Sequence, residues 1–404
     1  MELTAISKQK QQSILYAMVW RWHFYAGLCV IPFLLMLSIT GTIMLYDQPL
    51  QSLRYSNLTN ISNDSEMLGV QLLLSKIKTR YPQASVKKYM PGKRAGQASF
   101  FVIKQEGSSI HVALDPYTGE VLEEINRDDS WYALANAIHG SLLLGQWGDY
   151  AIEAATGLIV LLIISGLYLW YSTRHSGSLV LFPRLNQGKR TFYKQLHSSL
   201  GLYSCAFLIF FVISGLSWSG VWGAKLVQAW NSFPAQKWSY VELSEHDHAS
   251  LNQGVVEEVP WNLEQTARPL SRTVYADQAQ PFDLAGVVAI AQQLGMDNFQ
   301  INLPATKEAV YTLSADTMSG DVSDPRLDRT VHIDQNTGEI LVDIGWSEYT
   351  LMAKFMAAAI GLHQGGLGWV NLLFNTLLCA CFILISLSGL YLCWLRKPKN
   401  SWSL

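Results

Sequence analysis

Four histidines stand where an imidazole could bind a metal inside or beside a membrane. His23 and His197 open two long apolar segments, while His139 and His363 end two short helical segments that precede two more. Neutral imidazole binds iron well, and ionisable side chains at membrane depth are costly enough that their presence suggests a functional site. The sequence therefore predicts two bis-histidine haem sites, one formed by His23 with His197 and one by His139 with His363.

Small residues recur beside these histidines at helical spacing. A porphyrin needs a flat gap beside the helix that carries its ligand, and Gly27 and Gly201 each follow a ligand histidine by four residues, about one turn. Gly41 and Gly215 follow the same histidines by 18 residues, five whole turns, so the same face opens again at the far end of the helix. Glycine beside Ser or Thr also lets membrane helices pack closely, and the coincidence with paired histidines favours the cofactor.

Two further glycines, Gly166 and Gly389, each lie near the C-terminal end of their apolar segment, the second and the fourth. We expect them to make room for the haem of the first histidine pair, and Gly41 and Gly215 to flank the haem of the second. A metal ion without a porphyrin is the other chemical interpretation. It is disfavoured because no Asp, Glu or Cys lies at ligand spacing from either pair, and two histidines make a poor zinc or copper site.

These histidines require membrane-spanning helices to hold them. Half of the 404 residues are hydrophobic and 15% are charged, which is too apolar for an ordinary soluble protein. A helix crosses a hydrocarbon core of roughly 30 Å with about 20 residues. The predicted transmembrane helices comprise residues 17–46, 150–173, 195–223 and 369–395.

The distribution of Lys and Arg predicts how the chain crosses the membrane. Basic residues near the ends of the apolar segments place the two tails, 1–16 and 396–404, and the loop 174–194 in the cytoplasm. The two long connections then lie on the exported side, which in a Gram-negative bacterium is the periplasm. The expected location is the bacterial inner membrane.

Each long connection is predicted to hold a small α+β domain followed by an interfacial helix. The domains comprise residues 47–128 and 224–346, and the helices 129–146 and 347–364. Within each domain a helix led by Asp64 or Asp283 precedes strand-like alternation, over 100–104 and 110–115 in the first domain and 310–314 and 330–334 in the second. The fold class is a membrane protein, mainly α with α+β, built as an internal two-fold repeat.

The repeat is clearest at one turn in each domain. Asp115 to Leu122 and Asp334 to Leu341 share the pattern Asp-x-x-Thr-Gly-Glu, in which Gly119 and Gly338 supply the positive φ of a tight turn. The spacing from the helix-leading Asp to the Thr of this turn is the same in both copies.

The remaining histidines carry weaker signals. His246 and His248 flank an aspartate in an acidic loop and could touch a metal ion or an iron chelate, but a short exposed His-x-His motif is common. His111, His175 and His332 receive no role.

At this point the sequence resembles the family of PepSY-associated transmembrane proteins, often called iron-regulated membrane proteins, over nearly its whole length. The shared motifs are His-x-x-x-Gly at His23, His139-Gly-Ser-Leu-Leu-Leu-Gly-Gln-Trp-Gly, Ser-Gly-Leu-Tyr, and Asp-x-x-Thr-Gly-Glu. The resemblance implies an inner-membrane reductase that carries two b-type haems on His23, His139, His197 and His363 and acts on ferric siderophores in the periplasm. The second copy departs from the pattern, since it reads His363-Gln-Gly-Gly-Leu-Gly-Trp369.

The hypothesis is that electrons enter at the cytoplasmic side and reduce a ferric chelate docked on the exported domains. The donor, a quinol or a cytoplasmic reductase, must be external, because no G-x-G-x-x-G fingerprint follows a predicted strand. Two alternatives remain: a membrane cytochrome that exchanges electrons with quinol or a redox protein, and a non-enzymatic PepSY protein that binds or regulates a partner. The net charge of −2 argues against nucleic acid as a partner.

Overall fold

The structure, a computed structural model, describes residues 2–62, 66–172, 181–186, 188–223, 269–272 and 282–395. The chain divides into two compact units. We name them the helical unit (residues 1–43, 135–222 and 373–404) and the sheet unit (44–134 and 223–372). The predictions for Asp64, for His175 and most of the loop around it, for His246 and His248, and for the tail 396–404 fall outside the described residues.

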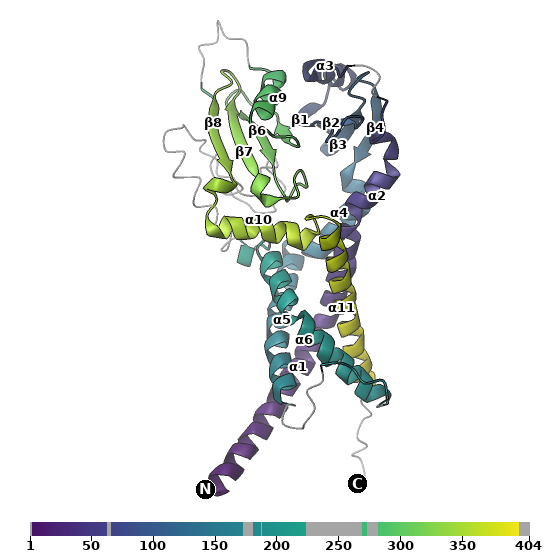
Figure 1. The fold of residues 1–404 in the computed structure, drawn as a ribbon, viewed down its shortest axis with the longest axis vertical. Helices are drawn as coiled ribbons and strands as arrows, with labels where there is room; N and C mark the ends of the chain where they lie inside the picture. Colours follow the sequence, from purple (N-terminus) through teal and green to yellow (C-terminus); the bar gives the residue numbers. More distant parts are fainter. Residues whose placement is uncertain are drawn as a thin grey trace. The chain divides into compact units, whose positions relative to one another are not determined.

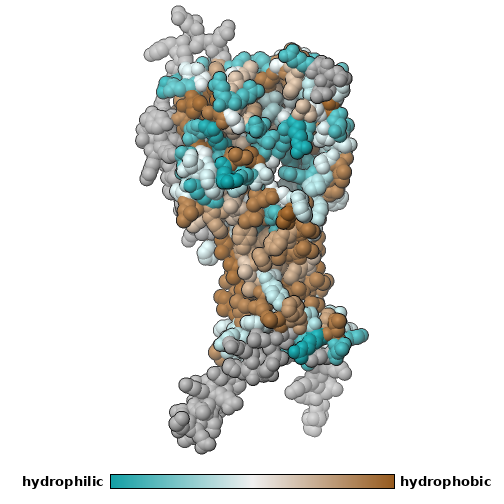
Figure 2. All heavy atoms as spheres, viewed as in Figure 1, coloured by the Kyte–Doolittle hydropathy of each residue, from teal (hydrophilic) through white to brown (hydrophobic). Residues whose placement is uncertain are grey.

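The helical unit is made by four long helices (Figure 1). They are α1 (Glu2–Leu45), α5 (Gln146–Ser172), α6 (Lys189–Leu216) and α11 (Trp369–Trp394), and the short α4 (Trp131–Ser141) leads into α5. Among the described residues, these four long helices are apolar enough to cross a membrane. Figure 2 shows hydrophobic side chains gathered over them and hydrophilic ones over the sheet unit.

The third predicted span extends too far. We expected a helix to residue 223, but α6 ends at Leu216. Its last turn is closed by Ser219, whose hydroxyl donates to the carbonyl of Leu216 at 2.7 Å, and the amide of Gly220 donates to Asp149 at 2.7 Å. Polar partners for the terminal backbone groups thus end the helix although the apolar composition continues.

The interior of the helical unit is filled by branched side chains from three helices. Val30 of α1, Ile159 and Ile163 of α5, and Val212 of α6 form one buried cluster. Buried hydroxyls among these helices, such as that of Ser204, donate to the carbonyl four residues earlier. Each of these hydroxyl protons is thereby hydrogen-bonded within its own helix, as a membrane interior requires.

The sheet unit is built on one antiparallel sheet of eight strands in the order β4-β3-β2-β1-β5-β6-β7-β8. The first four are β1 (Ser85–Met90), β2 (Ser99–Gln105), β3 (Ser108–Leu114) and β4 (Val121–Asn126). The others are β5 (Gln300–Asn302), β6 (Val310–Ala315), β7 (Arg329–Asp334) and β8 (Ile340–Gly345). From either edge to the centre, the strands run from the last to the first of their half, β4 to β1 on one side and β8 to β5 on the other. The two halves join where Tyr89 of β1 pairs with Ile301 of β5.

Helices α3 (Val70–Arg80) and α9 (Leu284–Gln293) pack against this sheet. Ile77 of α3 and Val287 of α9 are fully buried in the same core as Phe101 and Leu313 of the strands. The unit also contains α2 (Asp47–Arg54), α10 (Leu351–Gln364) and the 3-10 turns Ser56–Leu58, Arg127–Asp129, Pro325–Leu327 and Trp346–Glu348. The predicted strands correspond to β2, β3, β6 and β7. Asp283 caps α9 as expected, since its carboxylate accepts from the amide of Gly286 at 2.8 Å.

The two Asp-x-x-Thr-Gly-Glu turns have the same geometry. The Asp115 carboxylate accepts from the amides of Tyr117 and Thr118 at 2.7 and 3.1 Å, and Gly119 has a φ of 69°. In the second turn the Asp334 carboxylate accepts from the amides of Asn336 and Thr337 at 2.8 and 3.0 Å, and Gly338 has a φ of 74°.

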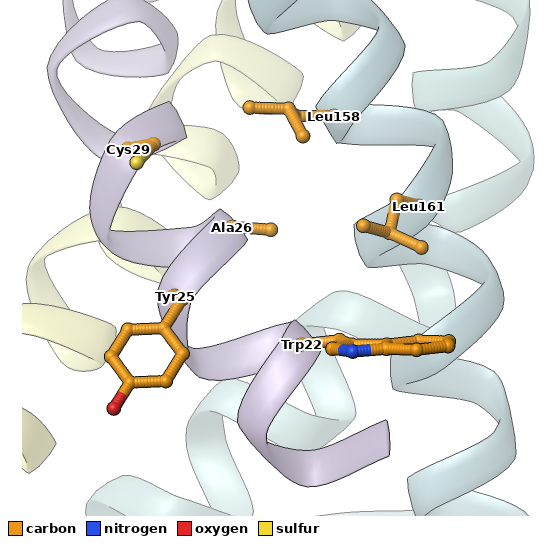
Figure 3. Close-up of a pocket in the computed structure, with 6 residues that line it drawn as sticks. All are labelled: Trp22, Tyr25, Ala26, Cys29, Leu158 and Leu161. Carbon is orange, nitrogen blue, oxygen red and sulfur yellow. The ribbon is translucent and has the colours of Figure 1, made fainter. Parts of the chain in front are cut away.

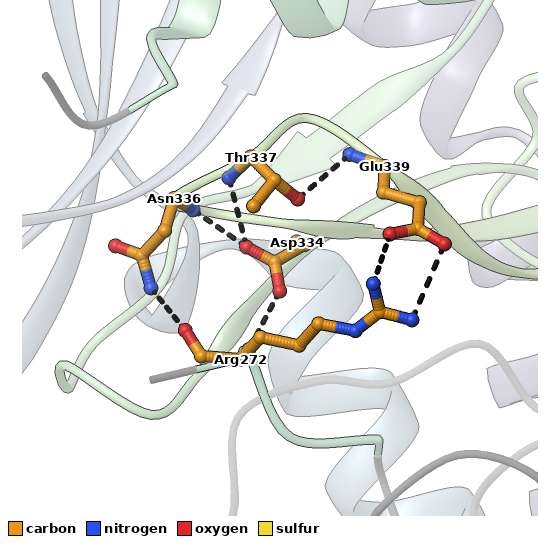
Figure 4. A network of polar contacts seen from close by, with 5 residues as sticks. All are labelled: Arg272, Asp334, Asn336, Thr337 and Glu339. Atoms are coloured by element: carbon orange, nitrogen blue, oxygen red, sulfur yellow. Dashed lines mark hydrogen bonds and ion pairs between the residues drawn. The ribbon is translucent and has the colours of Figure 1, made fainter. Parts of the chain in front are cut away.

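The second turn carries one addition (Figure 4). The Asp334 carboxylate also accepts from the amide of Arg272 at 2.6 Å, and the Arg272 guanidinium pairs with Glu339. The segment at Arg272 is thereby fastened to this turn.

The two halves differ in one connection. β2 and β3 are joined by Glu106 and Gly107, both at positive φ, which is the backbone of a tight hairpin. β6 and β7 are instead joined by a longer connection, residues 316–328, which contains Asp316 and Asp321. Among the described residues Oδ2 of Asp321 has no hydrogen-bond partner, and burial together with the Asp316 carboxylate raises the pKa of Asp321 to about 7.

Asp321 therefore makes the stability of the sheet unit depend on pH. The folded state holds a proton that the unfolded chain releases near its ordinary pKa of 3.8, so the free energy of unfolding falls as pH rises from about 4 to about 7. Asp321→Asn should remove the share of this loss that comes from Asp321, about 2 to 4 kcal/mol. Burial also raises the pKa of Asp316, which keeps its own share. The measurement is denaturant unfolding of the full-length protein in detergent between pH 4 and 8.

Asp324→Asn is the matched control. Asp324 is paired with Arg326, which lowers the pKa of its carboxyl, so this change should leave the fall between pH 4 and 7 in place. An Asp321→Asn protein with the same pH profile as wild type would contradict the prediction.

Candidate functional site

The structure brings two of the four predicted ligands together. The ring centroids of His23 on α1 and His197 on α6 lie 6.4 Å apart, with their planes at 88°. Nδ1 of His23 lies 2.9 Å from the hydroxyl of Ser165 on α5. Nδ1 of His197 lies 3.1 Å from both the hydroxyl of Ser388 and the carbonyl oxygen of Ile385, on α11. Each ring is thus held by a neighbouring helix through Nδ1.

Glycines accommodate these rings directly. A Cβ on Gly166 would lie 3.1 Å from Cε1 of His23, and one on Gly389 would lie 3.4 Å from Cε1 of His197. We expected these two glycines to make room for a macrocycle, but they face the imidazoles themselves. The physical reason is that a histidine between two helices needs both an acceptor and a flat surface on the opposing helix, and the Ser-Gly pair supplies both.

The two glycines on the ligand helices differ from each other. A Cβ on Gly27 would lie 3.7 Å from the Leu162 side chain, in ordinary contact. A Cβ on Gly201 would meet nothing within 4 Å in the described structure. A methyl group at Gly201 would therefore meet no described neighbour, while one at Gly27 would contact Leu162.

His139 has the same surroundings at the other end of α1. Its Nδ1 lies 2.8 Å from the hydroxyl of Thr40, and a Cβ on Gly41 would lie 3.6 Å from its Cε1. Burial lowers the pKa of His139 to about 4. The ring is therefore neutral at physiological pH, the form in which imidazole binds metals.

His363 lies in the last turn of α10, in the sheet unit, and its pairing with His139 stays a prediction. The long β6–β7 connection supports this helix. The hydroxyl of Thr317 donates to the carbonyl of Ala357 in α10 at 3.2 Å, and the Asp328 carboxylate accepts from the amide of Thr317 at 3.1 Å. Gly365 ends α10 in the left-handed conformation, with a φ of 73°. Gly215, the last glycine of the prediction, lies in the final turn of α6.

The connection between α4 and α5, which follows His139, is sharply bent and closely packed. Leu142 and Leu143 have φ values of 53° and 60°, a left-handed conformation that costs a bulky residue about 1 to 3 kcal/mol. Any Cβ on Gly148, in the first turn of α5, would overlap the carbonyl of Ser141. The segment from His139 to Gly148 is therefore held in one sharp connection between α4 and α5.

Two acidic residues near the start of α5 escaped the sequence analysis. Glu153 is buried within the apolar helix and accepts from the amide of Val221 at 2.7 Å, and Asp149 accepts from the amide of Gly220. Their spacing of four residues on a membrane helix was the signal that could have revealed them. They bind the backbone that follows α6.

An apolar groove of about 490 Å³ lies between α1 and α5 (Figure 3). It is lined by Trp22, Tyr25, Ala26 and Cys29 of α1 and by Leu158 and Leu161 of α5. Trp22 directly precedes His23, so the groove and the imidazole occupy neighbouring faces of one helix turn.

A unit of four apolar helices and a separate unit with an antiparallel sheet define a multi-pass membrane protein with a polar part. A sequence profile of the PepSY-associated TM region matches residues 20–397, and the chain belongs to that family. The family resemblance seen in the sequence is thereby confirmed. No curated protein matches the chain.

The connection between α4 and α5 yields a prediction about stability. Gly148→Ala should destabilise the protein by about 1 to 3 kcal/mol or more, because the added methyl overlaps a backbone oxygen that cannot move without shifting α4. The measurement is the thermal unfolding midpoint of the protein in detergent.

Gly157→Ala, on the same helix, is the control. A Cβ there would meet nothing within 4 Å in the described structure, so the midpoint should stay the same or rise. Equal midpoints for the two variants would show that the connection tolerates the methyl.

Proposed function

We propose that this protein binds two b-type haems and transfers electrons to a ferric siderophore or another ferric chelate on the exported side of a bacterial inner membrane. The observation that supports it best is the separation of 6.4 Å between the His23 and His197 rings. A metal bonded to two imidazole nitrogens at about 2 Å each separates the ring centroids by roughly 6 Å. The separation of the pair therefore fits two imidazoles that would hold one metal between them.

The donor set favours haem over a bare ion. Among the described residues no group of three or more His, Cys, Asp or Glu side chains could hold a metal ion. Two histidines alone leave a metal short of ligands, whereas a porphyrin brings four nitrogens of its own. His23 and His197 would hold this haem, which would supply one-electron chemistry when bound.

His139 and His363 are the proposed ligands of the second haem. His139 is neutral and anchored through Nδ1 by Thr40, as the first pair is anchored by Ser165 and Ser388. One haem near each membrane face would give electrons a route across the bilayer. The sequence carries no dinucleotide fingerprint, so the donor is a separate molecule.

The two halves of the sheet are the proposed PepSY-like domains of an internal two-fold repeat. The matching turns at Asp115 and Asp334, and a strand order that reads alike from both edges, support this. The basic residues near the helix ends support an orientation with both termini in the cytoplasm and the sheet unit in the periplasm, where a ferric chelate would dock. Reducing Fe(III) weakens its hold in oxygen-donor chelators, so release requires no acid, base or nucleophile from the protein.

A second candidate is a membrane cytochrome that exchanges electrons with quinol. The groove beside His23 supports it, because it is apolar and is lined by the aromatic side chains of Trp22 and Tyr25. Two mixing experiments followed by the visible spectrum would distinguish the electron acceptor from the electron donor. In one, the prereduced protein is mixed with ferric siderophore. In the other, the oxidised protein is mixed with quinol or a reduced flavoprotein.

Haem content tests the proposal. The purified protein should show a Soret band and two haems per chain in a pyridine-haem assay. His23→Ala and His363→Ala should each lose about one haem, because each change removes one of the two side chains that would hold it.

His111→Ala is the control, since His111 lies on strand β3 and is not one of the proposed ligands. This variant should keep both haems. A colourless wild-type protein, or ligand variants with full haem content, would overturn the proposal. A colourless protein would favour the non-enzymatic PepSY binding protein instead.

A further inference from the structure

Three of the four proposed ligands share one hydrogen-bonding arrangement. In each, Nδ1 lies within 3.1 Å of a Ser or Thr hydroxyl on another helix, and the next residue is the glycine that faces Cε1. The pairs are His23 with Ser165, His197 with Ser388, and His139 with Thr40. The arrangement does not depend on which helix carries the histidine.

The proton of each hydroxyl is already used. Ser165 donates to the carbonyl of Leu161 at 2.6 Å, Ser388 to that of Ile385 at 2.8 Å, and Thr40 to that of Met36 at 2.8 Å. A hydroxyl has one proton, and a carbonyl oxygen can only accept. The hydroxyl must therefore accept from the imidazole, and the imidazole proton lies on Nδ1.

Backbone carbonyls lead to the same assignment independently. Nδ1 of His197 lies 3.1 Å from the carbonyl oxygen of Ile385, and that oxygen has no proton to give. Backbone hydrogen bonds also join His23 to Leu162 and His139 to Leu37. In all three cases the backbone partner lies three residues before the Ser or Thr.

We propose that Ser165, Ser388 and Thr40 are positioning residues that hold their histidines in the Nδ1–H tautomer and present Nε2 to the haem iron. The inference rests on the proposed function and concerns which nitrogen binds and how basic it is. A hydrogen bond donated from Nδ1–H makes the ligand nitrogen more basic, which stabilises oxidised iron and lowers the midpoint potential. The hydroxyls thus act on the metal through the histidine.

Ser165→Ala tests the role at His23. The backbone hydrogen bond to Leu162 remains, so the helices should still assemble, but haem retention should weaken about 10-fold. The midpoint potential of one haem should rise, and its low-spin electron paramagnetic resonance signal should shift. Ser165→Thr keeps the hydroxyl and should restore all three properties.

Ser172→Ala is the matched control on the same helix. The Ser172 hydroxyl likewise donates to the carbonyl four residues earlier, that of Tyr168 at 2.8 Å. This variant should leave the potential and the resonance signal unchanged. The control separates loss of the imidazole partner from loss of a helix hydroxyl.

Thr40→Val provides a second, isosteric test at His139 if Ser165→Ala does not assemble. It should raise the midpoint potential of the other haem. Wild-type protein with two haems, together with Ser165→Ala and Thr40→Val proteins of unchanged potential and haem retention, would overturn the inference. Wild-type protein without haem would instead overturn the proposed function, so the two failures are distinguishable.

Discussion

A buried imidazole among apolar helices needs an acceptor for its N–H, and much of the helical unit is arranged around that need. An unpaired polar group in a membrane interior costs several kcal/mol, so each histidine constrains the helix that faces it. His23 sets the position of α5 through Ser165, and His197 sets that of α11 through Ser388. The glycine after each serine allows this close approach, because a larger side chain would strike the ring.

The same constraint explains why α1 carries two such contacts. His23 lies on α1 and reaches toward α5, whereas Thr40 of the same helix receives His139 from α4. α1 therefore contributes a histidine near one end and an acceptor near the other. A helix used in both ways is fixed in rotation along its length, which would suit the haem ligands proposed above.

In the sheet unit, polar groups act at the connections. The paired turns at Asp115 and Asp334 close their hairpins with the same carboxylate-to-amide bonds. The β6–β7 connection is longer than its counterpart in the first half, the tight β2–β3 hairpin. Thr317 within the longer connection supports α10, the helix that carries His363 in its last turn. The connection in which the two halves differ thus contacts the helix that carries His363. The sequence motif at His363 also differs from the one at His139.

The sequence by itself determined the four apolar helices, the strands β2, β3, β6 and β7, the two Asp-led turns and the proximity of His23 to His197. These features rest on local periodicity, on turn chemistry and on repeated spacing, all of which can be read along the chain. The tertiary structure alone decided that Gly166, Gly389 and Gly41 face imidazoles, that α6 ends at Leu216, and that Glu153 binds the amide of Val221. Each of these depends on which side chain of one helix meets which backbone group of another, and spacing along a single helix carries no information about its neighbour.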